Sequence, residues 1–349
     1  MTTFRLILRS LRHRPASQAA TALAIAISAA VITGALLVGD SVRGSLRRRV
    51  ELRLGAVTHA VVPGDRLVTA DLASRLSRRL SRPAAGLLEV PGVAATPDGS
   101  RRLPRVTVLG IDAAIAAMAG PAGFTVPAAG EVIMGAAAAG RLGLAPGQVV
   151  VVRAENLNAF PRDTPLAAAG SRQVALRLTL RAILGEDQLA GLSLRADPLS
   201  PVNLFVDRTD LCRALELPDR VNRILLAAPA ATDEAMAAAL AATWRLDDVG
   251  LDLRERAGGC TLTSERIFLD AEVQRAAAAL DPAAATVLTY FVTAIGRAGC
   301  ESPFAFITGT DAAWLHGDLG DDGVVVNRWL ADDLACGPGD TLDIRYLAV

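Results

Sequence analysis

Residues Pro15–Gly39 read PASQAATALAIAISAAVITGALLVG and carry no charged side chain. A helix rises about 1.5 Å per residue, so about 20 apolar residues cross a bilayer core about 30 Å thick. Charged residues flank the stretch, with Arg12 and Arg14 before it and Asp40 and Arg43 after it. The stretch therefore predicts a transmembrane helix, around which the rest of the chain is organised.

Two other interpretations of residues 15–39 stay open. A secretory signal peptide also has a basic start and an apolar middle, but its apolar region usually measures about 7–15 residues. A buried core helix can be apolar on every side, but such a helix is unusual in a soluble domain of this size. The length of the uncharged run favours the span over both.

Residues 1–14 have an amphipathic pattern. Arg5, Arg9 and Arg12 would lie on one face of a short helix, opposite a set of apolar residues at helical spacing. The apolar set is Phe4, Ile7, Leu8 and Leu11. We predict a helix on the membrane surface, with its apolar side in lipid and its arginines on anionic headgroups. A frayed terminus of the same composition is the alternative.

Residues 40–55 continue the helical pattern beyond the span. Leu46, Val50 and Leu54 recur at every fourth position, and Gly55 follows where a helix would end on a residue with positive φ. We predict a stalk helix in which these three apolar residues pack. The stalk either transmits displacement between the membrane and the body or serves as a simple connection.

The body, residues 56–349, has an α+β pattern. Short β-branched runs predict strands, and leucines at positions 72, 76 and 80 predict a helix over 68–80. The predicted strands lie in THAVVPG (58–64), LLEVPGVAATP (87–97), LPRVTVLGID (103–112) and ALRLTLRAILG (175–185). Because the strands do not alternate regularly with helices, we expect a mixed sheet of non-consecutive strands and not a βαβ fold.

The body contains a repeated unit. Residues 131–153, EVIMGAAAAGRLGLAPGQVVVVR, align without gaps with residues 323–345, GVVVNRWLADDLACGPGDTLDIR. Each copy predicts a strand, a short helix, a Pro-Gly turn and a second strand. Pro146 and Gly147 set the turn in the first copy, and Pro338 and Gly339 set it in the second, because proline fixes φ and glycine accepts a positive φ.

The composition excludes several functions. Acidic and basic residues balance at 36 each, so no net field favours nucleic acid. The sequence contains no lysine, so it cannot form a phosphate-binding loop of the G-x-x-x-x-G-K-[ST] type. The apolar stretches 224–244 and 276–295 are interrupted by charged residues and Pro282, so neither predicts a second span.

No residue pattern predicts an enzyme, a metal site or a cofactor site. There is no G-x-S-x-G motif, and His59 and His316 have no recognisable nucleophile. The segment His316–Gly323 (HGDLGDDG) could offer oxygens to a hard cation, but an exposed turn explains it better. The same holds for the polar loop after residue 154. Among Cys260, Cys300 and Cys336 one disulfide is conceivable, and buried free thiols are the favoured alternative.

Several segments in order resemble the FtsX-like permease family of ABC transporters, whose members carry a MacB-type periplasmic core domain after the first span. They are GDSVRGSL after the span, VTVLGID, GEVIMGAAAAGRLGLAPGQVVVVR, LTLRAILGED, VNLFVDRTDL, RVNRILLAA and SPFAFITGTD. The resemblance covers nearly the whole chain. It rests on the order of loose strand-and-turn patterns after a lone N-terminal span.

The resemblance implies a transporter subunit. It implies a separate ABC ATPase subunit, a homodimer or a paired permease, and no catalysis by this chain. It also implies an inner-membrane location, with the N-terminus cytoplasmic and the body periplasmic; the arginines on both sides of the span do not decide this orientation. Family members carry three more spans after the body, so we interpret residues 1–349 as the N-terminal portion.

We therefore expect a permease subunit that couples ATP hydrolysis by a separate subunit to an extracytoplasmic conformational change or to export. The alternative is a membrane-anchored extracytoplasmic binding or scaffold protein without an ATPase partner. A secreted hydrolase is a second alternative, which the lack of a recognisable nucleophile and base disfavours. The residues expected to matter are structural or mechanical: those of the surface helix, the stalk and the two Pro-Gly turns.

Overall fold

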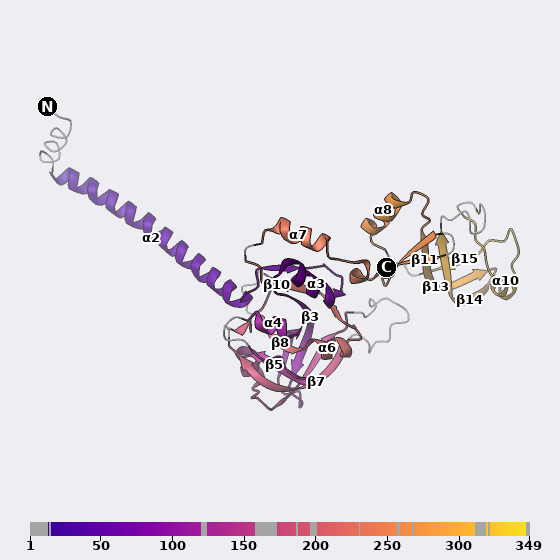
Figure 1. Ribbon diagram of the computed structural model, residues 1–349, viewed down its shortest axis with the longest axis horizontal. Coiled ribbons are helices and arrows are strands. Elements are labelled where there is room, and N and C mark those ends of the chain that lie inside the picture. Colours follow the sequence, from indigo (N-terminus) through magenta and orange to yellow (C-terminus); the bar gives the residue numbers. More distant parts are fainter. Residues whose placement is uncertain are drawn as a thin grey trace. The chain divides into compact units, whose positions relative to one another are not determined.

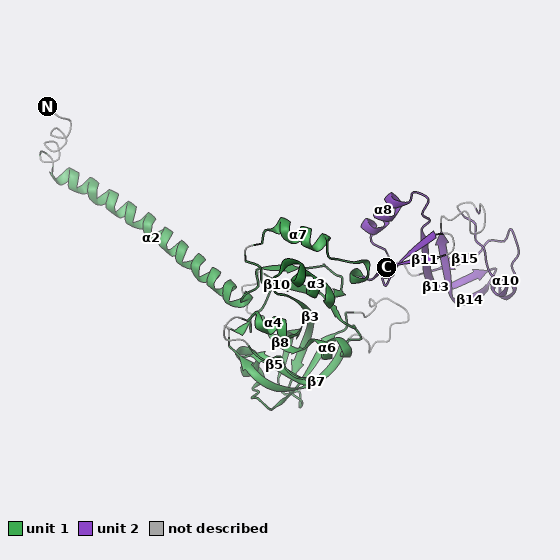
Figure 2. Cartoon of the chain, viewed as in Figure 1, with its two compact units in different colours: residues 1–160, 168–249 green, residues 161–167, 250–349 purple. Residues whose placement is uncertain are grey.

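The structure is a computed structural model, and it divides the chain into two compact units (Figure 2). Unit 1 comprises residues 1–160 and 168–249, and unit 2 comprises residues 161–167 and 250–349. The described residues are 13, 15–119, 124–157, 173–185, 188–195, 201–229, 231–256, 259–266, 269–310, 319 and 322–346. The predicted surface helix, with Phe4, Ile7, Leu8 and Leu11, lies outside the described residues.

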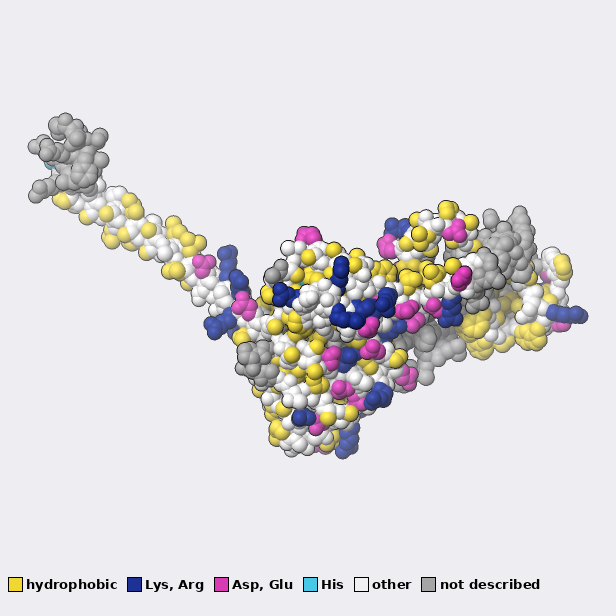
Figure 3. Space-filling model, in the orientation of Figure 1, with side chains coloured by type: hydrophobic (Ala, Val, Ile, Leu, Met, Phe, Trp, Pro, Cys, Tyr) yellow, Lys and Arg dark blue, Asp and Glu magenta, His cyan; other side chains and the backbone are white. Residues whose placement is uncertain are grey.

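Helix α2 (Pro15–Leu54) is one uninterrupted helix of 40 residues and contains no buried residue (Figure 1). It covers both the uncharged stretch 15–39 and the charged stretch that follows. The space-filling view shows apolar side chains along its length and arginines near the end that joins the body (Figure 3). Within the described part of the chain, α2 is the one helix long and apolar enough to cross a bilayer.

The strands of unit 1 close into a barrel. They are β3 (Ala84–Ala95), β4 (Arg102–Ile111), β5 (Glu131–Gly135), β6 (Val149–Glu155), β7 (Gln173–Leu184) and β8 (Asn203–Asp207). The pairings run β3–β4–β8–β5–β7–β6, and a further pairing joins β6 back to β3. β3 pairs with β4 along one edge and, through Gly92–Ala95, with β6 along the other; its register with β4 shifts between Gly92 and Ala94. A side chain at Gly92 would collide with the Arg153 carbonyl, 2.8 Å from the position of a Cβ atom.

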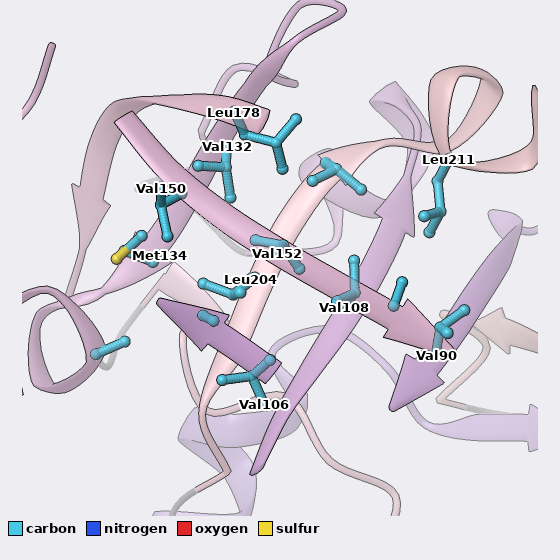
Figure 4. Close-up of a cluster of buried hydrophobic side chains, with 14 of the residues drawn as sticks. Val90, Val106, Val108, Val132, Met134, Val150, Val152, Leu178, Leu204 and Leu211 are labelled. Carbon is cyan, nitrogen blue, oxygen red and sulfur yellow. The ribbon is translucent and has the colours of Figure 1, made fainter. Parts of the chain in front are cut away.

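Alternation along these strands separates two apolar faces. Leu88 and Val90 of β3 lie in one buried cluster, and Leu87 lies in another. The first cluster draws residues from all of the barrel strands, which places it inside the barrel. Val90, Val108, Val152 and Leu204 point into this shared interior (Figure 4). Helices α5 (Ala136–Leu142) and α6 (Arg208–Ala214) add residues to it.

Other elements of unit 1 lie outside the barrel, and two of its short strands extend the sheet from the edge of β3. These elements are β1 (His59–Val61), β2 (Val68–Thr69), α3 (Ala70–Leu80), α4 (Ala113–Ala117), β9 (Arg220–Val221), β10 (Arg223–Leu226), α7 (Asp233–Ala241) and the 3₁₀-helix η2 (Leu246–Val249). α3 buries Leu72 and Leu76, as its period predicts. This helix begins at residue 70 and not at 68, because Val68 and Thr69 pair with β9.

Unit 2 is smaller and has its own apolar cluster. Its elements are β11 (Leu251–Arg256), β12 (Gly259–Ser264), α8 (Ala271–Leu280), β13 (Val287–Arg297), β14 (Cys300–Thr310), α10 (Arg328–Asp333) and β15 (Asp343–Arg345). β13 lies between β14 and β15 and is antiparallel to both. The cluster is centred on Val292, Ile295, Leu330 and Leu334. The predicted fold class is confirmed: a long apolar N-terminal helix precedes a mixed α+β body.

Candidate functional site

The junction between α2 and the body is the first candidate site. Gly55 ends the helix with φ +55°, and a Cβ atom there would lie 2.6 Å from the Met118 carbonyl oxygen. The Ala56 N–H donates to the same carbonyl at 2.9 Å. Leu54 and Val57 pack into the outer cluster of the barrel. The end of α2 is therefore fixed to the body by backbone hydrogen bonding and apolar packing.

The predicted stalk residues divide into two groups. Leu54 contacts the core of the body, whereas Leu46 and Val50 are 57% and 51% exposed. Val42, one turn earlier, is 53% exposed. The three exposed residues form an apolar stripe along the stalk, at the helical spacing i, i+4 and i+8. Such a stripe suits contact with a second helix or with lipid.

Arginines surround this stripe. Arg43, Arg47, Arg48 and Arg49 lie on the exposed helix next to the uncharged stretch. Arg47 pairs with Glu51 one turn later, with Nε and Oε1 2.9 Å apart, and such exposed i, i+4 pairs contribute about 0.3–0.5 kcal/mol. Most of the positive charge is thus available to anionic headgroups at the membrane boundary.

A buried ionic cluster ties η2 to α3. Asp248 is 1% exposed and accepts hydrogen bonds from the Thr69 hydroxyl, the Arg75 guanidinium and the Arg245 backbone N–H. Burial opposes ionisation of Asp248, but these hydrogen bonds and the Arg75 charge outweigh it, so its pKa lies below the usual range. Arg75 also pairs with Asp71. The sequence patterns missed this cluster, because nothing local links Arg75 with Asp248.

A pocket of about 360 Å³ lies beside α6 and the loop after it. Arg208 lines it and pairs with Asp219 at 2.8 Å and with Asp112 at 3.6 Å. Cys212 also lines it, and burial raises the pKa of its thiol, which disfavours the reactive thiolate. The pocket therefore offers a charged rim and no activated nucleophile.

No metal centre is assembled by the described residues, since no three of their His, Cys, Asp and Glu side chains converge. Asp322 and Glu155 are exposed, while His316, Asp318, Asp321 and Asp163 lie outside the described ranges. The four cysteines are free. Cys260 and Cys300 are exposed and Cys336 is partly exposed, so the expectation of buried thiols at these three positions is wrong; Cys212, outside that set, is buried.

The two Pro-Gly turns are the same structure. Gly147 and Gly339 have φ values of +91° and +93°. In the first copy the Ala145 N–H donates to Gln148 Oε1 at 2.8 Å, and in the second the Gly337 N–H donates to Asp340 Oδ2 at 2.7 Å. The backbone bonds Gln148 to Ala145 and Asp340 to Gly337 are both 3.1 Å long. The predicted short helix, Pro-Gly turn and second strand are thus found in both copies, but the predicted first strand forms only in the first copy, as β5, and residues 323–327 form no strand.

Comparisons with known proteins give little beyond the fold. No protein-family model and no curated protein matches the chain. Among solved structures, the chain is similar to the crystal structure of the periplasmic region of MacB from Actinobacillus actinomycetemcomitans. The match covers 50% of this chain and 72% of the MacB chain. The identity is 10% and the TM-score is 0.31, values too low to support an argument about function.

Proposed function

We propose that this chain is an FtsX-like permease subunit of an ABC transporter, anchored in the inner membrane by α2. A separate subunit hydrolyses ATP, and α2 conveys the resulting motion to the extracytoplasmic body. The chain itself performs no catalysis. Its N-terminus lies in the cytoplasm, and the body lies in the periplasm.

The observation that carries this proposal is the continuity of α2 from the uncharged stretch into the core of unit 1. A helix bends little unless proline or another defect interrupts its hydrogen bonds, and α2 has no proline after Pro15. Its end is held at Met118 and by the packing of Leu54 and Val57. A tilt or shift of the span is therefore transmitted to unit 1.

Pairing of subunits is part of the proposal. The exposed stripe of Val42, Leu46 and Val50 suits a second helix from another copy or from a related permease. The absence of a lysine phosphate loop from residues 1–349 agrees with an ATPase on a separate chain. An anchored scaffold protein would have no ATPase partner, so co-purification of an ATPase distinguishes the two functions.

The test is a pull-down of the tagged full chain from membranes of its native host. We expect an ABC ATPase subunit to co-purify, and we then measure ATP hydrolysis with wild-type chain and with Val50→Pro. Proline inside a helix costs about 3 kcal/mol or more and would interrupt the stalk, so coupling to the ATPase should be lost. Val50→Ala keeps the helix but shortens a side chain of the pairing stripe, so it measures how much of any loss comes from the stripe alone.

Each outcome separates the alternatives. If the intact chain is in the membrane and no ATPase co-purifies, the transporter proposal is wrong and the anchored scaffold is favoured. If the ATPase co-purifies and Val50→Pro hydrolyses ATP as the wild type does, α2 does not convey the motion.

A further inference from the structure

The strand register gathers three arginines on one face of the unit 1 barrel. Arg102 of β4 lies opposite Ala95 of β3, and Ala95 lies opposite Val151 of β6. Val151 in turn lies opposite Arg177 of β7, so one row of residues crosses four neighbouring strands. Arg153 follows Val151 by two residues on β6 and therefore shares its face. We call Arg102, Arg153 and Arg177 the arginine face.

The arginine face points away from the barrel interior. In the adjacent row, Leu103, Ala94 and Val152 lie opposite one another and belong to the inner cluster. Val152 points into the interior in Figure 4. Because successive side chains on a strand alternate between its two sides, the row with the arginines points outward. All three arginines are exposed, and the surface between them is apolar, with Val93 and Val151 half-buried.

The three arginines have no partner in the described part of the chain, neither a carboxylate nor a side-chain hydrogen bond. Other arginines of the barrel are paired: Arg181 lies 2.8 Å from Glu131, and Arg223 lies 3.2 Å from Glu89. Glu155 lies two residues beyond Arg153 on the same side of β6 and forms no ion pair with it. The positive charge of the arginine face is therefore available to a ligand.

The corresponding face of unit 2 is neutralised within the chain. Arg345 is the counterpart of Arg153 in the repeat, and its Nη1 lies 2.7 Å from Glu301 Oε1. Glu301 lies opposite Gly296, and Gly296 lies opposite Asp343. The row in unit 2 thus carries two carboxylates, whereas the row in unit 1 carries two arginines. The excess of positive charge belongs to unit 1 and not to the repeated unit in general.

The spacing of the arginines suits an extended acidic peptide. Arg153 lies opposite Ala175 and so diagonal to Arg177, a separation of about 7–8 Å. Arg102 and Arg177 are three strand spacings apart, about 14 Å. Carboxylates at alternate positions of an extended chain are also about 7 Å and about 14 Å apart. Each arginine can therefore meet one carboxylate, and such pairs form strong, often bidentate hydrogen bonds.

A protein ligand fits the face better than a lipid surface does. Leu87, near the start of β3, packs in the outer cluster with Leu54 at the end of α2. Ala95 lies eight residues further along β3, about 26 Å from Leu87. The stalk, residues 40–54, adds about 22 Å of helix between the uncharged stretch and the body. An apolar surface among charged residues is also the usual anatomy of a protein interface.

We propose that the arginine face binds a short acidic segment of another protein, in an extended conformation and with carboxylates at alternate positions. A segment of about five to seven residues covers the face. Because this contact area is well below that of a stable complex, we expect weak binding that depends on salt. This inference goes beyond the proposed function and does not depend on it.

The probe is the synthetic peptide EAEAEAE with a rhodamine label at its N-terminus. It is added to the full chain in nanodiscs of phosphatidylcholine, which contain no anionic lipid, and fluorescence anisotropy is measured. We expect saturable binding that weakens about tenfold between about 50 mM and about 300 mM NaCl. The labelled peptide QAQAQAQ has the same length and no carboxylates, and it should not bind.

Variants locate the contact. Arg153→Gln and Arg177→Gln should each weaken binding about three- to tenfold. Arg78→Gln is the matched control, because Arg78 is exposed on α3, has no ion pair in the described part of the chain and loses the same charge. Its binding should equal that of the wild type. The melting temperature of each variant checks that it is folded.

Reversal of charge gives an independent test. The double variant Arg153→Glu with Arg177→Glu should lose binding of EAEAEAE and gain binding of RARARAR. The proposal is overturned if EAEAEAE does not bind the wild type, if it binds the wild type and both glutamine variants equally, or if Arg78→Gln weakens binding as much as they do.

A competition experiment tests the lipid surface. Unlabelled EAEAEAE should displace the labelled peptide more effectively than phosphatidylglycerol vesicles at the same concentration of negative charge. If the vesicles displace more of the labelled peptide, the face binds a lipid surface and the proposal is overturned.

Discussion

The two copies of the repeated unit share a short helix and a Pro-Gly turn and differ in burial. Residues 131–153 form α5, a Pro-Gly turn and two strands of a closed barrel, β5 and β6, whereas residues 323–345 form α10, the same turn and one strand of a smaller sheet, β15. The turn has the same φ and the same hydrogen bonds in both. The comparison teaches that local sequence sets the turn and helix, while the elements packed against each copy set which apolar residues are buried.

The largest effect is expected where the copies differ most in burial. Val152→Asp places a carboxylate in the barrel interior at a side chain that is 0% exposed, and it should destabilise unit 1 by about 4 kcal/mol or more. At the equivalent position Ile344 is 41% exposed, so Ile344→Asp should destabilise unit 2 by less than about 1 kcal/mol. Urea unfolding of the full chain, followed by hydrogen exchange in each unit, measures both. Similar losses in the two units would contradict the assignment of burial.

The two turn glycines should respond alike. Gly147→Val and Gly339→Val force a β-branched residue to φ near +90°, which costs about 1–3 kcal/mol, and no atom lies within 4 Å of either added Cβ. The loss is therefore conformational and should appear in the melting temperature of the unit that carries the change. An unchanged melting temperature in either variant would show that the turn does not hold its glycine at positive φ.

The helix starts differ between the copies. The Asn327 side chain caps α10 by accepting a hydrogen bond from the Leu330 N–H at 2.8 Å, whereas its counterpart Gly135 has no side chain to cap α5. Asn327→Ala should destabilise α10 by about 1 kcal/mol, and Asn327→Asp should retain most of the stability. Hydrogen exchange of the α10 amides measures this difference. If the α10 amides exchange equally fast in the wild type and in Asn327→Ala, the Asn327 side chain does not stabilise the helix.

The smallest effect concerns pH. The Gly337 N–H and Arg297 lower the pKa of Asp340 in unit 2, whereas unit 1 has the neutral Gln148 at this position. Because the folded pKa lies below the unfolded value of about 3.9, the contribution is complete well above pH 4 and is lost as pH falls below it. Asp340→Asn should therefore make the stability of unit 2 depend less on pH below about pH 4. If the melting temperature of unit 2 falls between pH 5 and pH 3 as steeply in Asp340→Asn as in the wild type, Asp340 is not responsible for the loss of stability.

Much of the architecture could be predicted from sequence. The uncharged run and Gly55 indicated a helix that ends at Leu54, because charge and glycine act locally. The β-branched runs located β3, β4 and β7, and the Pro-Gly pairs located the turns. The residues proposed for the surface helix lie outside the described residues, and the packing of Leu46 and Val50 in a stalk stays a prediction.

Contacts between distant residues could not be predicted in this way. The barrel closes where Gly92 meets Ala154, α2 is fixed where Ala56 meets Met118, and η2 is held where Asp248 meets Arg75. No periodicity or motif connects the members of these pairs. They depend on which elements pack together, which is a property of the folded chain.

By itself the sequence determined the long apolar helix, the strands β3, β4 and β7 and the two Pro-Gly turns, because charge, side-chain branching and backbone freedom act over a few residues. Only the tertiary structure decided that β3 pairs with β6, and that Val132, Ile133 and Val152 are buried while their counterparts Val324, Val325 and Ile344 are exposed. The physical reason is that burial depends on which elements cover a surface, and those elements come from distant parts of the chain.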